Sequence, residues 1–125
     1  MILKNEAGEI LLVKRAIDPR KGFWDVPGGF VDQGETFEEC TIREAKEELG
    51  AEIIDLKYID SLIGTYLFQN IEYETLGVMF EATLKNIDDL EPADDVASYS
   101  FFKPDDLPFE NFAFTWMDKF FKNYV

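Results

Sequence analysis

The chain has 125 residues, of which 46% are apolar and 15% aromatic, so it is long and apolar enough to bury a hydrophobic core. Its formal net charge of −14 argues against nucleic acid as a partner, because phosphate backbones are bound through Lys and Arg. No apolar run reaches the roughly 18 residues that span a bilayer, so we expect no membrane association.

Cys40 is the only cysteine, and the chain has no histidine. An intrachain disulfide is therefore excluded, and a zinc site is not expected. A lone cysteine favours a reducing, cytoplasmic location. The first residues do not read as a signal peptide, because Lys4, Asn5 and Glu6 interrupt any apolar stretch.

The N-terminal part predicts two strands. Residues 9–14 form an apolar run after the turn at 5–8, and Met1 to Leu3 reads as the end of an earlier strand. A loop follows, and four basic residues cluster there: Lys14, Arg15, Arg20 and Lys21. They indicate either contact with a phosphate or an ordinary solvated loop, and Arg15 is the strongest single candidate because it ends a strand.

Residues 22–27 lead into the turn Pro27-Gly28-Gly29. Trp24 has the chemistry to stack on a base, but packing beneath the loop is the favoured interpretation. A helix is predicted after the turn. Thr36 and Glu39 fit a capping box that starts it, and Gly50 is suited to a left-handed cap that ends it.

Side chains of this helix sort into two faces at about 100° per residue. Ile42, Ala45 and Leu49 form a stripe that we expect to face the core. Three glutamates, Glu44, Glu47 and Glu48, occupy a neighbouring arc about 100° wide, and Arg43 is spaced to pair with Glu47.

Like charges at i and i+4 repel, and a divalent cation would reverse the sign of that interaction. Carboxylate oxygens suit hard ions such as Mg²⁺ or Mn²⁺. Taken alone, three clustered glutamates are more often a solvated helix face.

The spacing of the whole segment changes that balance. Residues 29–51 resemble the Nudix box, G-x5-E-x7-R-E-U-x-E-E-x-G-U with U apolar. Its fixed positions are all filled here, by Gly29, Glu35, Arg43, Glu44, Glu47, Glu48 and Gly50. Ala45 and Ala51 are smaller than the aliphatic residues that the pattern prefers. The resemblance implies one Nudix domain over residues 1–125, an α/β/α sandwich with a mixed sheet between helices.

The resemblance also implies roles for the site residues. Glu44, Glu47 and Glu48, with the carbonyl oxygen of Gly29, would hold Mg²⁺, or Mn²⁺ as its substitute. Glu35 and Arg43 would orient these groups. The proton of the attacking water would pass to Glu48 or to Asp95.

Strands are predicted at 52–59, 61–68 and within 71–85, the last with a nearly continuous apolar run typical of a central strand. Tyr66, Phe68 and Tyr73 cluster between strands, either as packing groups or as a base pocket. Tyr66 is the substrate-binding candidate.

The acidic loop 86–95 reads as a solvated surface by composition. The resemblance implies that such a loop often supplies a further carboxylate, and Asp95 is the closest match, with Asp94 and Glu91 next. A strand is expected at 97–103. A last helix is predicted after Asn111 by an apolar stripe made of Ala113, Trp116, Met117, Phe120, Phe121 and Tyr124.

The implied reaction is hydrolysis of the pyrophosphate bond in a nucleoside diphosphate linked to another moiety, such as ADP-ribose or NADH. The alternative is a catalytically silent Nudix-like sensor that binds a nucleotide or metabolite. A third reading is an acidic interaction domain with solvated glutamates. Relatives usually carry a longer first strand, so we expect a shortened sheet edge here and a second subunit that covers it.

Overall fold

A computed structural model describes residues 1–124. It contains strands β1 (Ile2–Lys4), β2 (Ile10–Arg15), β3 (Trp24–Asp25), β4 (Ile53–Phe68), β5 (Ile71–Leu84) and β6 (Val96–Phe102), helices α1 (Phe37–Leu49) and α2 (Thr115–Tyr124), and a 3₁₀ turn η1 (Ile87–Asp89). None of these helices is long and apolar enough to cross a membrane.

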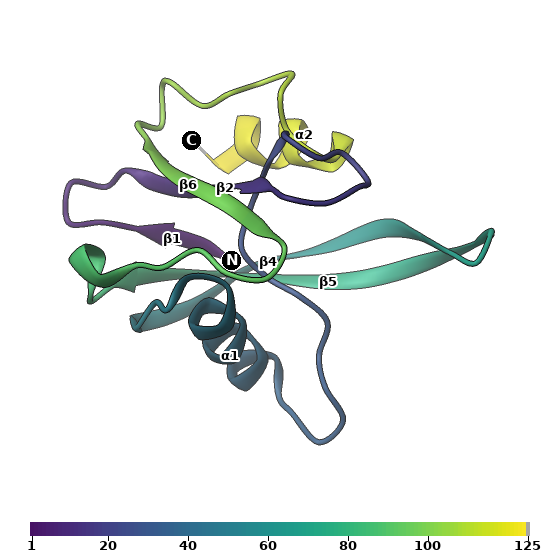
Figure 1. Cartoon of the computed structure of the whole chain (residues 1–125), viewed down its shortest axis with the longest axis horizontal. Helices are drawn as coiled ribbons and strands as arrows, with labels where there is room; N and C mark the ends of the chain where they lie inside the picture. The colour runs from purple at the N-terminus through teal and green to yellow at the C-terminus, as the bar shows by residue number, and fades with distance from the viewer. Residues whose placement is uncertain (125) are drawn as a thin grey trace.

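The strands form one mixed sheet in the order β3-β2-β1-β5-β4. Strands β1 and β3 pair with successive parts of one edge of β2, and β6 pairs along its opposite edge. Among the pairs of strands within residues 1–124, only β1 with β5 is parallel. Helices α1 and α2 cover opposite faces of the sheet (Figure 1). The prediction of an α/β/α sandwich is therefore confirmed.

Alternation along the short strands divides the core in two. Ile2, Ile10 and Leu12 belong to a cluster that contains Met117 and Phe121 of α2. The residues between them point to the other face and join a cluster with two residues of α1: Leu3, Leu11, Val13, Ala45 and Leu49. The amphipathic stripe predicted for the C-terminal helix thus packs as expected. Trp24 is also a packing residue, edge-on to Phe102 with 5.0 Å between ring centroids.

The limits of α1 agree with the local signals. The Thr36 hydroxyl accepts a hydrogen bond from Glu39 N at 3.1 Å, and the Glu39 carboxylate accepts one from Thr36 N at 3.0 Å. Gly50 ends the helix in the left-handed region, with φ of 61°. This conformation favours glycine.

The expected core stripe of α1 is wrong at one position, because Ile42 is 52% exposed. Cys40 is buried instead, along with Ala45 and Leu49. At about 100° per residue, the arc from Cys40 to Leu49 spans about 180°, and Ile42 lies just beyond its end. Glu44 and Glu48 fall inside that arc. The helix therefore turns two of its carboxylates toward the protein.

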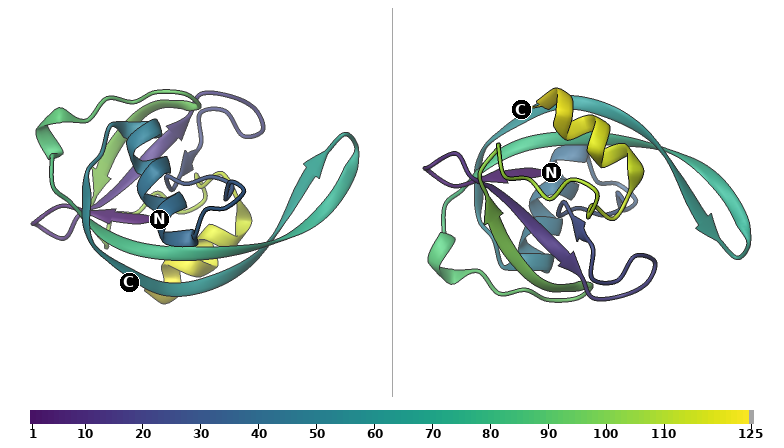
Figure 2. Two further views of the ribbon diagram at one scale, coloured as in Figure 1. Left: turned by 90° about the horizontal axis from the view of Figure 1, so that it is seen from below. Right: turned by 90° about the horizontal axis from the view of Figure 1, so that it is seen from above.

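Two strand predictions need correction. Residues 53–68 form one strand rather than two. The pairing of this strand with β5 shifts register after Ile54 and after Tyr58, whereas the apolar pattern of the sequence predicts a break between two strands. The first strand is not a sheet edge, because β1 lies between β2 and β5. The far halves of β4 and β5 extend as a hairpin beyond both helices (Figures 1 and 2).

Candidate active site

The loop between β3 and α1 is held against the last turn of the helix. Gly28 N donates a hydrogen bond to Glu48 Oε1 at 2.8 Å. Pro27 beside it is fully buried. The peptide groups at Gly28 and Gly29 therefore lie next to the inward carboxylates of α1.

Gly29 leaves room for the carboxyl group of Glu44. A Cβ built at position 29 would overlap all three atoms of that group. Because glycine has no side chain, it leaves a space, here called the cradle, in which the Glu44 carboxylate approaches the backbone of the loop. The box therefore requires glycine here because of a close approach rather than because of an unusual backbone angle.

Arg43 organises the acidic groups around it. Its Nε and Nη2 donate to the two oxygens of Glu35 at 2.7 and 3.0 Å, a bidentate pair. Its Nη1 donates to Glu44 at 2.9 Å and to Glu47 at 3.0 Å. Nη2 also donates to the carbonyl oxygen of Phe30 at 3.1 Å. The loop and the helix are therefore tied together through one guanidinium.

This arrangement shifts the acidity of the groups that take part. Hydrogen bonds from Arg43, with one from the backbone of Asp32, lower the pKa of Glu35 to about 2. The Arg43 pKa is raised, chiefly by its pairing with Glu35. Glu35 is thus a permanently charged anchor for Arg43 at neutral pH, which fits the orienting role expected for the pair.

The two inward glutamates carry poorly compensated charge. Burial, with the negative charges of Glu44 and Asp25, raises the pKa of Glu48 to about 7, against the hydrogen bond from Gly28. Burial likewise raises the pKa of Glu44, although Arg43 opposes this. A cation placed between these groups would relieve the repulsion.

The donors present fit a hard divalent ion. They are carboxylate oxygens and the carbonyl oxygen of Gly29, which accepts from Cys40 Sγ at 3.9 Å, and Mg²⁺ prefers oxygen ligands. The cradle at Gly29 gives Glu44 a defined position beside the backbone. Within residues 1–124, however, no three ligating side chains lie close enough together, as they stand, to hold a metal ion. Glu47 is half exposed and turned to Arg43.

Sequence reasoning missed Asp25. This carboxylate is largely buried at the end of β3, close enough to Glu48 for its charge to raise the pKa of that residue. It accepts hydrogen bonds from Val26 N at 2.8 Å and from Arg15 Nη1 at 3.1 Å. The available signal was a single acidic residue inside an apolar strand that runs into the turn.

Arg15 lies near the site through this ion pair. Its guanidinium is engaged by Asp25 and by the carbonyl oxygen of Pro19, at 2.7 Å. Asp95 stands in the turn before β6, where its carbonyl oxygen accepts from Ala16 N at 2.8 Å, and its side chain is exposed. The same loop touches the end of α1, because Ala93 N donates to the carbonyl oxygen of Glu48 at 2.9 Å.

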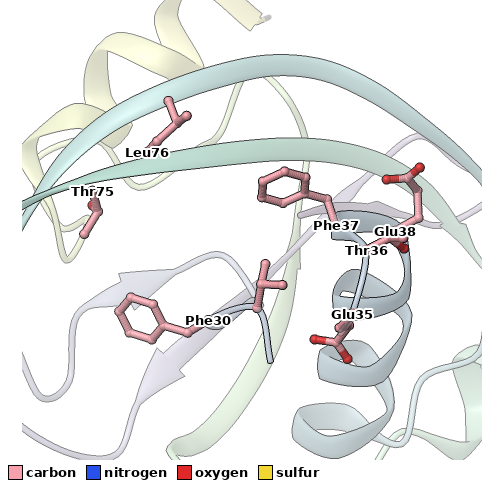
Figure 3. A pocket seen from close by; sticks show the side chains of 8 residues that line it. Phe30, Glu35, Thr36, Phe37, Glu38, Thr75 and Leu76 are labelled. Carbon is pink, nitrogen blue, oxygen red and sulfur yellow. The ribbon is translucent and has the colours of Figure 1, made fainter. Parts of the chain in front are cut away.

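An open hollow of about 710 Å³ adjoins the box. It lies between the loop, the first turn of α1 and the base of the hairpin, and its lining comprises Phe30, Val31, Glu35, Thr36, Phe37, Glu38, Thr75 and Leu76. Figure 3 shows the Thr75 side chain of β5 directed to the same side as Phe30. Tyr66 packs edge-on against Phe30, with 5.1 Å between ring centroids. Phe30 therefore lines the hollow, whereas Tyr66 is not among the lining residues and is connected to it through its contact with Phe30.

The chain is similar in sequence to several known proteins. An ADP-ribose pyrophosphatase of Methanocaldococcus jannaschii is 36% identical over 118 residues, which are 94% of this chain and 66% of that protein. A NAD-capped RNA hydrolase, NudC, of Pseudomonas aeruginosa is 38% identical over 63 residues, which are 49% of this chain and 22% of that protein. The chain thus spans less than two thirds of the length of these relatives.

The fold is similar to that of solved structures. An Ap4A hydrolase of C. elegans, solved as a binary complex, superposes with a TM-score of 0.72 over 98% of this chain and 90% of that one, at 22% sequence identity. At that identity the likeness concerns the fold alone. The family model for the NUDIX domain matches residues 1–124, nearly the whole chain and the box within it. The chain belongs to the NUDIX domain family.

Proposed function

We propose that residues 1–125 act as a single Nudix hydrolase domain that cleaves the pyrophosphate bond of a nucleoside diphosphate linked to another moiety. One observation carries the proposal. Glu44 and Glu48 face inward beside the Gly28–Gly29 turn, with Arg43 holding the outer acidic groups in place. This concentration of negative charge, which a bound cation would compensate, supports the proposal.

Glu44, Glu48 and the Gly29 carbonyl would hold Mg²⁺, or Mn²⁺ in its place, and Glu47 would join them by turning away from Arg43. Such ions neutralise the charge of a pyrophosphate and make a bound water more acidic. Arg43 and Glu35 keep the helix and the loop in register. Their effect on the reaction is one of position, as with the partners that orient metal ligands in other sites.

A carboxylate must take the proton of the attacking water. Glu48 has one oxygen committed to Gly28 N, and its other oxygen accepts no hydrogen bond from residues 1–124. Asp95 is the second candidate, on an exposed loop that touches the end of α1. An Asp95→Asn variant tests the second candidate: turnover near the parent rate would leave Glu48 as the base, whereas a full loss would give Asp95 a role as the base or as a metal ligand.

The nucleoside would lie in the hollow, against the aromatic pair of Tyr66 and Phe30. Arg15 would act on the diphosphate only if it exchanged part of its pairing with Asp25 for a phosphate oxygen. The net charge of −14 makes a cation-bridged nucleotide a better partner than a free polyanion.

ADP-ribose is the first substrate to test, because a relative that matches 94% of this chain is called an ADP-ribose pyrophosphatase. A panel of ADP-ribose, NADH and dinucleoside polyphosphates, with Mg²⁺ and without it, should give nucleoside monophosphate release from at least one member. A rise of Tm with Mg²⁺ but no turnover on any of them would favour a silent sensor instead. No response of Tm to Mg²⁺ or Mn²⁺ would contradict the metal site.

A further inference from the structure

The outer edge of β4 is free over the half of the strand that leaves the body of the protein. No strand within residues 1–124 pairs with that edge, because β4 is the last strand of its sheet. Residues 61–68 pair with β5 on the inner side in an unbroken register, and both register shifts lie earlier in the strand. No bulge in the pairing with β5 therefore interrupts this segment, and its outer edge is left free to accept another strand.

This edge has none of the usual features that prevent pairing. Natural sheets protect free edges with charged side chains, proline or bulges. Residues 61–71 contain no charged residue and no proline, in a chain that is 30% charged. The side chains beside the edge are instead apolar and exposed, at 68% for Ile63, 68% for Leu67 and 49% for Phe68.

Charge indicates which partner suits the edge. The chain carries a net charge of −14, so two copies repel each other over most of their surfaces. The uncharged segment is where that repulsion is smallest. A basic partner would be attracted to the acidic remainder of the surface rather than to this neutral segment, whereas an identical chain presents an identical neutral strand to it.

Symmetry gives the same answer. An antiparallel pair made by one strand with its own copy is closed by a two-fold axis, and each residue contact then occurs twice. Such a pair satisfies the exposed N–H and C=O groups of both edges at once. On the neighbouring strand β5, Ile71 and Leu76 are also exposed, at 55% and 71%, so the hairpin presents further apolar side chains one strand in from this seam.

We propose that the chain forms a homodimer in which Ser61–Phe68 of β4 pairs antiparallel with the same segment of a second copy. The two sheets then continue across the two-fold axis. This interface lies at the opposite end of the sheet from β3 and β6, and at a different place from the N-terminal strand, which is enclosed between β2 and β5.

Light scattering on the full chain tests the stoichiometry. We expect a mass twice the 14.5 kDa of one chain at about 100 μM protein, which is well above a dimer Kd of about 1 μM. Association should strengthen when salt shortens the Debye length to about 4 Å, because repulsion between the copies is screened. A mass of 14.5 kDa at this concentration would overturn the proposal.

Two matched variants locate the interface. Leu67→Glu places a charge on the edge and should leave the chain monomeric and folded, because Leu67 is already 68% exposed. Ile54→Glu adds the same charge to the same strand, at a side chain that is 45% exposed and outside the segment, and should remain dimeric. A dimer that persists in Leu67→Glu, or is lost in Ile54→Glu, would place the interface elsewhere.

Cysteine substitutions test the register. Ile63→Cys, Thr65→Cys and Leu67→Cys are made one at a time, and the buried Cys40 serves as the internal control. Residues that face each other across a two-fold axis have Cα atoms about 4.5 to 5.5 Å apart, within reach of a disulfide. Under mild oxidation, a cross-link that forms at one of these positions and not at Ile54→Cys would place the two-fold axis beside that position, whereas equal cross-linking at Ile54→Cys would contradict the pairing of this segment with itself.

Discussion

The carboxyl group of Glu44 occupies the space that a Cβ of residue 29 would fill. Gly29→Ala should therefore displace Glu44 while the fold persists, because a carboxyl group at the end of a flexible side chain can move. We expect the rise of Tm with Mg²⁺ to shrink and turnover to fall by about 10- to 100-fold. Gly77→Ala is the matched control, since a Cβ there makes only ordinary contacts, the nearest at 3.7 Å. Equal behaviour of the two variants would show that the Glu44 position is unimportant.

Glu48→Gln keeps the shape of the side chain and its contact with Gly28 but removes the negative charge. We expect kcat to fall by about 10²- to 10⁴-fold, as when a general base or a ligand charge is lost. The same change at Glu47 should also lower kcat, since the box implies that it joins the ion. Glu52→Gln, an exposed change just after the helix, should leave kcat as it is. Parental rates for Glu48→Gln would remove that residue from the site.

Arg43→Lys retains the positive charge but cannot reproduce the fork that binds Glu35. We expect a lower Tm and a kcat reduced by about 10- to 100-fold, because Glu44 and Glu47 lose their common partner. A double-mutant cycle with Glu35→Gln should show strong coupling in both quantities. Additive effects in that cycle would mean that the two residues act independently.

Leu49→Ala tests the packing of α1. Leu49 is fully buried in the cluster with Leu3 and Leu11, so its truncation should cost about 2 to 5 kcal/mol in the free energy of unfolding. Ile42→Ala on the same helix should cost less than about 1 kcal/mol, because Ile42 is 52% exposed. Urea denaturation of both variants measures the difference. Similar losses would contradict the orientation of the helix.

The free energy of unfolding should depend on pH through the ionisation of Glu81. The Tyr124 hydroxyl donates to its carboxylate at 2.6 Å and Lys4 pairs with it at 3.2 Å, and these contacts lower the pKa of Glu81 below its ordinary value of 4.5. Because the native state favours the charged form, this stabilisation is complete above the ordinary value. It is lost as the pH falls through the lowered one.

Tyr124→Phe removes the larger of these contacts. At pH 7 we expect it to cost about 1 kcal/mol, since the pair is partly exposed. The difference in the free energy of unfolding between Tyr124→Phe and the parent should become smaller as the pH falls below 4.5. Urea midpoints measured between about pH 3 and pH 7 check this, and a difference that stays constant would assign the cost to packing alone.

Local signals predicted much of the fold and of the candidate site. The capping box at Thr36, the left-handed Gly50 and the spacing of the glutamates each depend on residues within a few turns of one helix, and the structure agrees with the predicted helix limits. The pairing of Arg43 with Glu47 followed from the same short spacing. The apolar stripe of α2 needed only its period to be recognised.

Contacts between distant residues could not be obtained in this way. The proximity of Asp25 to Glu48 requires β3 and α1 to meet, and Tyr66 reaches Phe30 only because the hairpin folds over the loop. The acidic loop likewise contacts the end of α1 through backbone hydrogen bonds, which no sequence pattern predicts. Whether Asp95 takes part in the reaction stays a prediction.

The sequence by itself determined the family, the limits of α1 and the set of acidic side chains, because these depend on residue type at short, regular spacing. Only the tertiary structure decided that Glu44 and Glu48 face inward while Ile42 faces solvent, that β1 lies inside the sheet, and that half of a long hairpin extends beyond both helices. Burial is a property of what packs against a residue, and those neighbours come from parts of the chain that periodicity does not connect.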